Sequence, residues 1–275
     1  MIGDKVLAQR LLAVREYLRQ QSPLIHCITN PISINDCANV VLAVGAQPVM
    51  AEHPREAAAI TAAAGALVVN LGNITDVRME SMLLSGQCAY ERGIPIVLDL
   101  VGVTCSPLRA AYAQSFIRKC RPTVIKGNVS EIRFICGLDN HAIGVDAGAA
   151  DGLTLANRAW YAEKFGRFAR QQHALLLASG ALDLVTDGET SWLAANGSPL
   201  LARITGTGCM LGALTGTCLA AGDPLAGVLL AVLLMGIAGE MAAADAAGPG
   251  SCRAGLLDWM YRLTDTEIIE KAELL

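Results

Sequence analysis

Short apolar runs alternate with longer helical stretches through the first two thirds of this chain of 275 residues. The runs have the length and composition of buried strands and lie at residues 24–29, 66–70, 94–98, 123–125, 174–178 and 182–186. Helical stretches separate them, at residues 33–44, 55–64, 76–92, 107–119 and 155–172. Continuous apolar strands that alternate with helices are typical of a mostly parallel sheet covered by helices on both faces. The sequence therefore predicts an α/β fold.

The far edge of the sheet is expected to differ from the rest. Asp187-Gly188 lies between two apolar runs, and this dipeptide is a strong signal for a β-hairpin. An antiparallel hairpin at that edge is therefore predicted. From Thr207 onward the chain has helical character to its end, and no linker, low-complexity segment or repeat interrupts it. We expect residues 1–275 to form a single domain.

Composition narrows the class of protein. Hydrophobic residues make up 53% of the chain and charged residues 17%, which excludes intrinsic disorder. The most apolar segments, residues 204–222 and 224–239, are interrupted by a glycine-rich turn and by Asp223-Pro224, a pair typical of a helix start. We interpret them as two buried helices, not as membrane spans. Residues 1–20 have the pattern of an amphipathic helix and lack the apolar region of a signal peptide.

Charge and cysteine usage point to a small-molecule enzyme or binding protein of the cytoplasm. The net charge of −4 and the pI of about 5.6 argue against a nucleic-acid partner. The nine cysteines include no CxxC pair, so neither a zinc site nor a disulfide framework is indicated. Most are expected to be buried thiols in a reducing compartment. The four histidines have no metal-ligand spacing.

Polar or glycine residues follow almost every predicted strand. In parallel α/β sheets, ligands bind where the carboxyl ends of the strands meet the following loops. The sequence therefore predicts a site assembled from several loops. The residues at these ends are Asn30-Pro31, Asn70-Leu71-Gly72-Asn73, Asp99, Lys126-Gly127-Asn128 and Ser179-Gly180.

A glycine turn precedes the first of the two apolar helices. No Walker motif occurs, and the segment Gly206–Gly212 misses the dinucleotide-binding spacing by one residue. The turn can still cradle a phosphoryl group, because glycines and a helix N-terminus both present free N–H groups. It can equally be a plain turn before a buried helix. Cys209 follows it, in the first helical turn, where the pKa of a thiol is expected to fall. This cysteine could act as a base, as a nucleophile or as a small filler.

Asn128-Val129-Ser130-Glu131 allows two interpretations. Asn128 can cap a helix, with Glu131 at the spacing of a capping box. Alternatively, Glu131 and Asp99 hold a hydrated Mg²⁺, which usually binds one or two carboxylates and keeps several waters.

Together these segments resemble the ribokinase-like kinases of small hydroxylated molecules, through Asn128-x-x-Glu131 and the late Gly206-Thr207-Gly208 turn. Most of that superfamily has aspartate at the position of Cys209. The cysteine form, together with Ile28-Thr29-Asn30-Pro31, resembles the hydroxyethylthiazole kinase family of thiamine salvage. The resemblance extends from about Pro23 to Leu263. Further matching stretches are Gly45–Ala51, Val69–Gly72, Leu98–Val103, Ile125–Glu131 and Thr205–Cys209.

The resemblance implies a ribokinase-like fold and transfer of the ATP γ-phosphate to the hydroxyl of 4-methyl-5-(2-hydroxyethyl)thiazole. It implies Mg²⁺ as cofactor and a homotrimer with sites between subunits. The implied site residues fall into four groups: Asn30, Met50, Gly72 and Gly206 for the alcohol, Lys126, Ser179, Thr207 and Gly208 for ATP, Asp99 and Glu131 for magnesium, and Cys209 beside the reacting hydroxyl.

Three positions depart from the pattern of the family. Lys126 stands where arginine is frequent, Ser179 where threonine is common, and Leu100 where proline is usual, and none of these changes removes a catalytic group. A kinase of hydroxymethylpyrimidine or pyridoxal and a nicotinamide-nucleotide-hydrate dehydratase are the alternatives within the superfamily. Both normally carry aspartate at position 209. A non-catalytic nucleotide-binding regulator would be expected to lose Asp99, Glu131 or the glycines.

Overall fold

The computed structural model describes residues 2, 4–139, 141–142, 148 and 151–275. Within these residues, eight strands form one sheet in the order β2-β1-β3-β4-β5-β6-β7-β8. Neighbouring strands from β2 to β6 are parallel, whereas β7 and β8 pair antiparallel. The predicted sheet and its edge hairpin are therefore confirmed. The strands are β1 (Leu24–Ile28), β2 (Gln47–Val49), β3 (Ala66–Asn70), β4 (Ile96–Asp99), β5 (Val124–Asn128), β6 (Leu175–Ser179), β7 (Asp183–Thr186) and β8 (Ser191–Ala194).

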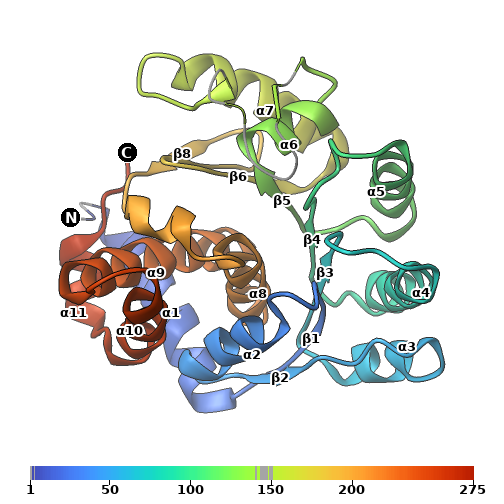
Figure 1. The fold of residues 1–275 in the computed structure, drawn as a ribbon, viewed down its shortest axis with the longest axis horizontal. Helices are drawn as coiled ribbons and strands as arrows, with labels where there is room; N and C mark the ends of the chain where they lie inside the picture. The colour runs from blue at the N-terminus through green and yellow to red at the C-terminus, as the bar shows by residue number, and fades with distance from the viewer. Residues whose placement is uncertain (1, 3, 140, 143–147, 149–150) are drawn as a thin grey trace.

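Helices cover both faces of the sheet (Figure 1). One face carries α4, α5 and α7, and the other carries α1, α2 and the C-terminal helices. The helices are α1 (Lys5–Gln21), α2 (Ile34–Ala43), α3 (Pro54–Ala63), α4 (Asp76–Arg92), α5 (Pro107–Cys120), α6 (Val129–Ile135), α7 (Arg158–Gln172), α8 (Thr207–Leu219), α9 (Pro224–Asp245), α10 (Pro249–Arg262) and α11 (Asp265–Lys271), with the 3-10 helix η2 at Pro199–Arg203.

The apolar strands divide their side chains between two cores, because successive residues of a strand point to opposite faces. In β3, Ala66 and Val68 belong to the core under α8 and α9. Leu67 and Val69 belong to the core under α4 and α5. This division explains why the strands are apolar throughout instead of alternating with polar residues.

Helices α8 and α9 are the two predicted buried helices. Asp223 caps α9 by accepting a hydrogen bond from the Ala226 N–H, at 3.2 Å. Helix α9 is long and apolar enough to cross a membrane, but 83% of its apolar window is buried inside the protein. Its apolarity is thus accounted for by packing against α1, α8 and α10.

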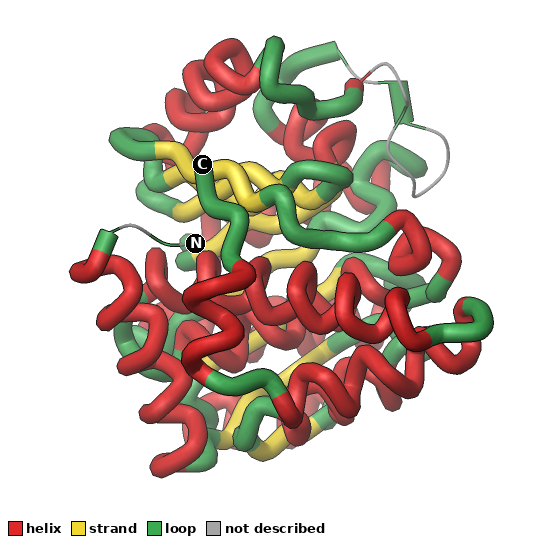
Figure 2. Tube along the Cα trace, turned by 90° about the vertical axis from the view of Figure 1, so that its left-hand side faces the viewer, coloured by secondary structure: helices red, strands yellow, loops and turns green. Residues whose placement is uncertain are grey.

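The two ends of the described chain meet at the sheet edge (Figure 2). The Ile2 N–H donates to the Ile269 carbonyl at 3.2 Å, and Leu193 of β8 exchanges backbone hydrogen bonds with Leu275. The C-terminal segment therefore covers part of the edge strand β8.

Four polar residues expected in loops are instead the last residues of strands or lie within one. Asp99 pairs with Lys126 in the β4–β5 register, and Asn128 pairs with Ser179 in the β5–β6 register. The ladder therefore continues through the polar residues, and it holds their backbones rigidly at the carboxyl edge.

Candidate active site

Three neighbouring strands place their polar ends side by side. Asn70 at the end of β3 is in register with Asp99 of β4, and Asp99 is in register with Lys126 of β5. The Lys126 ammonium Nζ donates to Asp99 Oδ1 at 2.9 Å, and Asn70 Nδ2 donates to Asp99 Oδ2 at 2.8 Å. The result is a buried, hydrogen-bonded row across the carboxyl edge of the sheet.

Burial governs the ionisation of this row. Asp99 is completely buried and Lys126 nearly so. Burial raises the pKa of Asp99, and the hydrogen bonds and charge of its partners act against that rise. For Lys126, burial alone would lower the pKa, but the charge and hydrogen bond of Asp99, together with smaller contributions from Cys209 and Glu131, outweigh it and the pKa is raised. The ammonium therefore stays charged at neutral pH, directly below the loops that would receive a ligand.

Glu131 connects two loops at the same edge. The Asn128 side chain accepts from the Glu131 N–H, and Glu131 Oε2 accepts from the Asn128 N–H at 2.8 Å, which confirms the predicted capping box. Its other oxygen, Oε1, accepts from the Gly102 N–H at 2.7 Å. Burial and the charge of Asp99 raise the pKa of Glu131 to about 7. The carboxylate thus fixes the β4–α5 loop against the start of α6.

The glycine turn leads directly into α8. Gly206 is the N-cap residue, with a φ of 91°, a left-handed conformation that favours glycine. The first N–H groups of a helix have no carbonyl one turn earlier to bind, so those of Thr207, Gly208 and Cys209 face the site. A Cβ built on Gly208 would lie 3.7 Å from Lys126 Nζ. A positive charge and a helix N-terminus therefore converge on one point, as an anion site requires.

The hydroxyl of Thr207 is directed away from this point. Thr207 Oγ1 donates to the carbonyls of Leu201 and Ile204, at 3.1 and 3.3 Å. This hydroxyl ties the turn to η2, so only the backbone N–H of Thr207 remains directed to the start of α8.

Cys209 lies in the first turn of α8 with 8% of its surface exposed. Burial, followed by the negative charge of Asp99, raises the pKa of this thiol, and the nearby Ser33 and Asn70 side chains act against that rise. The predicted lowering of the pKa is therefore wrong, because desolvation and a nearby carboxylate outweigh the helix dipole.

The residues expected to bind the alcohol approach the site from two sides. A Cβ built on Gly72 would lie 2.5 Å from Asn30 Nδ2 and 2.9 Å from Asn70 Oδ1, so these three residues are in close contact. Met50 follows β2 and packs, partly buried, against the same core as Cys209. Asn30, Gly72 and Met50 therefore all lie at the carboxyl edge of the sheet, because the strands that they follow, β1, β3 and β2, are parallel.

Ser179 ends β6 at the same edge. It is opposite Asn128 in the register, and its hydroxyl donates to the Gly127 carbonyl at 3.2 Å. The structure therefore brings the residues expected for ATP, magnesium and Cys209 to one edge of the sheet.

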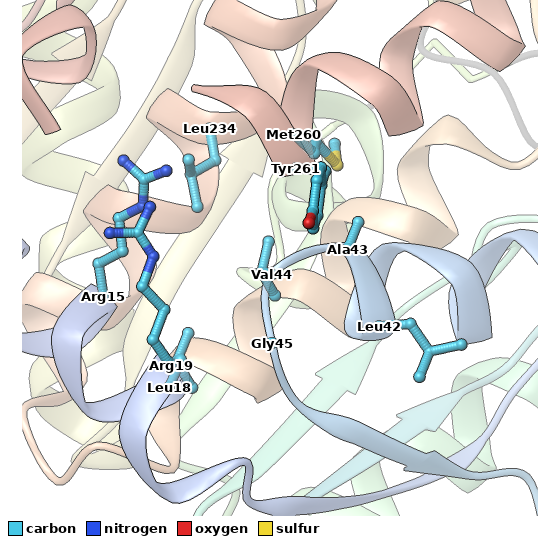
Figure 3. A pocket seen from close by; sticks show the side chains of 10 residues that line it. All are labelled: Arg15, Leu18, Arg19, Leu42, Ala43, Val44, Gly45, Leu234, Met260 and Tyr261. Carbon is cyan, nitrogen blue, oxygen red and sulfur yellow. The ribbon is translucent and has the colours of Figure 1, made fainter. Parts of the chain in front are cut away.

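A cavity of about 430 Å³ opens beside the glycine turn. Ile204 and Thr205 line it from one side, Ile32 and Asp36 from the start of α2, and Arg253 from α10. A smaller cavity, of about 120 Å³, lies between Arg19, Val44 and Tyr261 (Figure 3). It adjoins the C-terminal end of α2, whereas the active-site residues adjoin the N-terminal end. In the described residues, no cluster of three or more His, Cys, Asp or Glu side chains forms a metal site.

The sequence assigned no individual role to two residues of this site. Asn70 is named there only as a strand end, yet it binds Asp99 and the Gly72 N–H and lies near Cys209. Its position at the end of β3, in register with Asp99, is a signal that could have identified it. Ser33 was read only as the start of a helix, and nothing in the local sequence indicates its contact with Cys209.

Comparison with known proteins identifies the family. The model of the hydroxyethylthiazole kinase family matches residues 16–266. Hydroxyethylthiazole kinase 2 of Clostridium botulinum is 48% identical over 263 residues, covering 96% of this chain and 99% of that relative.

Solved structures agree with this result. The hydroxyethylthiazole kinase structure from Pyrococcus horikoshii superposes with a TM-score of 0.86 at 33% identity and covers 99% of both chains. A ribokinase-like superfamily protein from Enterococcus faecalis has a TM-score of 0.62 at 13% identity, covering 91% of this chain and 93% of its own, and it supports the fold alone. The family model and the near-full-length relative together show that the chain belongs to the hydroxyethylthiazole kinase family.

Proposed function

We propose that the protein transfers the γ-phosphoryl group of ATP to the hydroxyl of 4-methyl-5-(2-hydroxyethyl)thiazole, a step of thiamine biosynthesis and salvage. The observation that carries this proposal is the position of Cys209. Its thiol lies at the N-terminus of α8, next to the buried Lys126–Asp99 pair and the Asn70 amide. A hydroxyl bound there would lie between the thiol and a phosphoryl group held by the glycine turn.

The chemistry of such a transfer depends on positioning and electrostatics, because the transition state is loose and its charge spreads over the phosphoryl oxygens. The N–H groups of Thr207, Gly208 and Cys209 would hold those oxygens. The Lys126 ammonium adds a fixed positive charge that needs no reorganisation during the reaction. Ser179, at the end of β6, is the remaining residue that we assign to ATP.

The carboxylates of Asp99 and Glu131 fit a hydrated magnesium ion. Each of their oxygens accepts one hydrogen bond from the protein, and a carboxylate oxygen has a second lone pair available. Mg²⁺ commonly binds through one or two carboxylates and retains several waters. When bound, the ion would neutralise charge on the phosphates of ATP. We assign Asp99 and Glu131 to this role.

The raised pKa of Cys209 bears on its part in the reaction. At neutral pH the side chain is a neutral thiol that cannot take up a further proton, so it would orient the substrate hydroxyl, whose proton would pass to an oxygen of the transferred phosphoryl group as the new O–P bond forms. A loose transition state tolerates this late proton transfer, because little charge develops early on the attacking oxygen.

Cys209→Ala is expected to lower kcat by roughly tenfold to a hundredfold, because a lost positioning hydrogen bond in a buried site costs about 1–3 kcal/mol. The KM for the alcohol should change less than kcat, because the thiol acts mainly in the transition state. Steady-state kinetics with the thiazole alcohol and ATP measure both. Cys218→Ala, which changes a fully buried cysteine further along the same helix, is the matched control. A Cys209→Ala variant with unchanged kcat would show that the thiol has no part in positioning the hydroxyl.

A substrate panel tests the activity itself. ATP consumption is measured with the thiazole alcohol, with hydroxymethylpyrimidine and with pyridoxal, in the presence of Mg²⁺. We expect turnover of the thiazole alcohol at least tenfold above the other two, because cysteine replaces the aspartate that is usual in the kinases of those alcohols. Turnover of hydroxymethylpyrimidine alone would refute the proposal.

We further infer that residues 1–275 act as one kinase domain, that three copies assemble into a homotrimer with sites between subunits, and that the enzyme works in the cytoplasm. All nine cysteines are free thiols, which fits a reducing compartment. A particle mass three times the 28.8 kDa of one chain would identify the trimer.

A further inference from the structure

Arg78 lies in the first turn of α4, and its side chain is only 4% exposed. Its backbone N–H donates to the hydroxyl of Thr75, the N-cap residue of that helix, at 3.2 Å. The backbone therefore serves the helix start. A guanidinium taken out of water needs acceptors for its five N–H donors, and those of Arg78 come from outside α4.

Three separate segments supply these acceptors. Nε donates to the Glu52 carboxylate at 2.7 Å, in the segment between β2 and α3. Nη1 donates to the Asn73 carbonyl at 3.0 Å, in the segment between β3 and α4. Nη2 donates to the Thr29 carbonyl, directly after β1. One buried side chain thus ties together the segments that follow β1, β2 and β3.

Each of these contacts lies within two residues of a residue that we assign to the alcohol. The neighbours along the chain are Thr29 with Asn30, Asn73 with Gly72, and Glu52 with Met50. Because the Cα atoms of successive residues are fixed about 3.8 Å apart, a shift at any one contact displaces the site residue beside it. The guanidinium therefore controls how the three segments are spaced around the alcohol.

Two other side chains also hold the segment after β2. The Ser81 hydroxyl donates to the Glu52 carbonyl at 2.7 Å, and His26 Nε2 donates to the Ala51 carbonyl at 2.8 Å. Both contacts act on that segment alone. Arg78 joins it to the other two segments, so the spacing between the three depends on the guanidinium.

The shape of the arginine side chain suits this arrangement. Its N–H groups lie in one plane and point in several directions, whereas a lysine carries its charge and its donors on one nitrogen. The charge itself is balanced by the Glu52 carboxylate, whose side chain is 48% exposed. A lysine at position 78 would keep that ion pair but could not reach acceptors on three sides at once.

We propose that Arg78 is a positioning residue for the alcohol, which fixes the spacing of the segments that carry Asn30, Met50 and Gly72. This inference rests on the proposed phosphotransfer. Lys126 and Ser179, which we assign to ATP, lie on β5 and β6 and are not among the partners of Arg78. The effect of Arg78 is therefore confined to the alcohol.

Arg78→Lys tests the proposal. A displacement of about 1 Å in a site costs on the order of a hundredfold, and lysine keeps part of the contacts, so the KM for the alcohol should rise roughly tenfold. The KM for ATP should change by less than about twofold. Steady-state kinetics, with each substrate varied in turn, measure both values. An unfolded fraction lowers the apparent kcat but not the KM, so a merely structural role would leave the alcohol KM unchanged.

Arg15→Lys is the matched control. The Arg15 side chain is 7% exposed, donates to Asp265 Oδ1 at 2.9 Å and lies in α1 beside the smaller cavity (Figure 3). It thus has a burial and an ion pair like those of Arg78 but lies away from the carboxyl edge. Its replacement should lower the thermal unfolding temperature by a similar amount and leave both KM values as in the wild type.

A second pair of variants tests the proposal if Arg78→Lys does not fold. Glu52→Ala removes one partner of Arg78 at a half-exposed position and should raise the alcohol KM about threefold, the loss of roughly one hydrogen bond. Glu52→Gln keeps an acceptor oxygen for Nε and should restore a KM close to that of the wild type. An alcohol KM that is unchanged in Glu52→Ala would count against the proposal.

Other outcomes are equally decisive. Equal rises in the two KM values of Arg78→Lys would overturn the proposal, as would a tenfold rise in the alcohol KM of Arg15→Lys. If the wild type phosphorylates a different alcohol, the substrate proposed above is wrong, and the same comparison made with that alcohol decides the role of Arg78. If the wild type phosphorylates none, both proposals fall.

Discussion

Replacing Gly206 by valine is expected to lower kcat/KM at least a hundredfold. Gly206 has a φ of 91°, and a β-branched residue is strongly disfavoured there. Its Cβ would also lie 2.7 Å from the buried Ser33 Cβ, so the turn, or Ser33, has to move. The N–H groups of the turn are proposed to hold the phosphoryl group, and a displacement of about 1 Å in such a site costs on the order of a hundredfold in rate.

Gly222→Val is the matched control for this variant. Gly222 follows the other end of α8, also has a positive φ, of 83°, and has open space around the position of a Cβ. The same substitution there should reduce stability through backbone strain and leave kcat within about twofold, since it is remote from the site. Retention of a tenth of wild-type activity by Gly206→Val would contradict the role given to the turn.

Asp99→Asn is expected to lower the free energy of unfolding by about 3–5 kcal/mol, the typical cost of leaving a buried charge without its partner. Lys126 is 3% exposed, and its ammonium loses the carboxylate that keeps it charged. Urea denaturation at neutral pH measures the change. The pKa of Lys126 is raised in the folded protein by Asp99, so the pair contributes stability that is present below the ordinary lysine pKa and is lost as the pH rises through the raised value.

Two further variants show whether the loss of stability in Asp99→Asn comes from the unpaired buried charge. Asp99→Leu combined with Lys126→Met removes both charges and should recover most of the lost stability, because well-packed apolar residues often replace a buried ion pair without loss. It should remain inactive, because both residues belong to the proposed site. Glu163→Gln breaks the exposed Glu163–Arg167 pair, in which the side chains are 59% and 58% exposed, and should change stability by less than about 1 kcal/mol. Equal changes in the free energy of unfolding for Asp99→Asn and Glu163→Gln would show that the buried pair contributes no more to stability than an exposed pair.

The sequence predicted the fold where local pattern and tertiary packing agree. The bounds of β3 and α4 are those expected, because an apolar run and a capped helical stretch are each complete in themselves. Strand β2 was not predicted, because three residues that include Pro48 form no apolar run. Helix α9 continues past Glu240 to Asp245. Glu240 does not end it, because its carboxylate binds the Asn196 side chain and the Gly197 N–H.

The residues of the site were predicted where they lie at strand ends, but their environments were not. Strand-end residues such as Asp99 and Lys126 were identified, because parallel strands bring their ends together in a regular way. The pKa of Cys209 was predicted in the wrong direction, since its environment comes from Asp99, more than a hundred residues earlier in the chain, and from burial by other elements. The contact between Ser33 and Cys209 depends on how α2 packs against α8, which no local pattern encodes.

The placement of α8, α9 and α10 on one face of the sheet has a consequence for biosynthesis. These helices are the stretch at residues 207–262, and their side chains complete the core that also contains Leu11 and Leu18 of α1. During translation, α1, α2 and all eight strands leave the ribosome before α8, α9 and α10 can cover that face. Chains synthesised from the N-terminus expose such surfaces to aggregation until the missing partner emerges. The nascent protein therefore depends on chaperone protection, or on rapid completion, until its last quarter has been made.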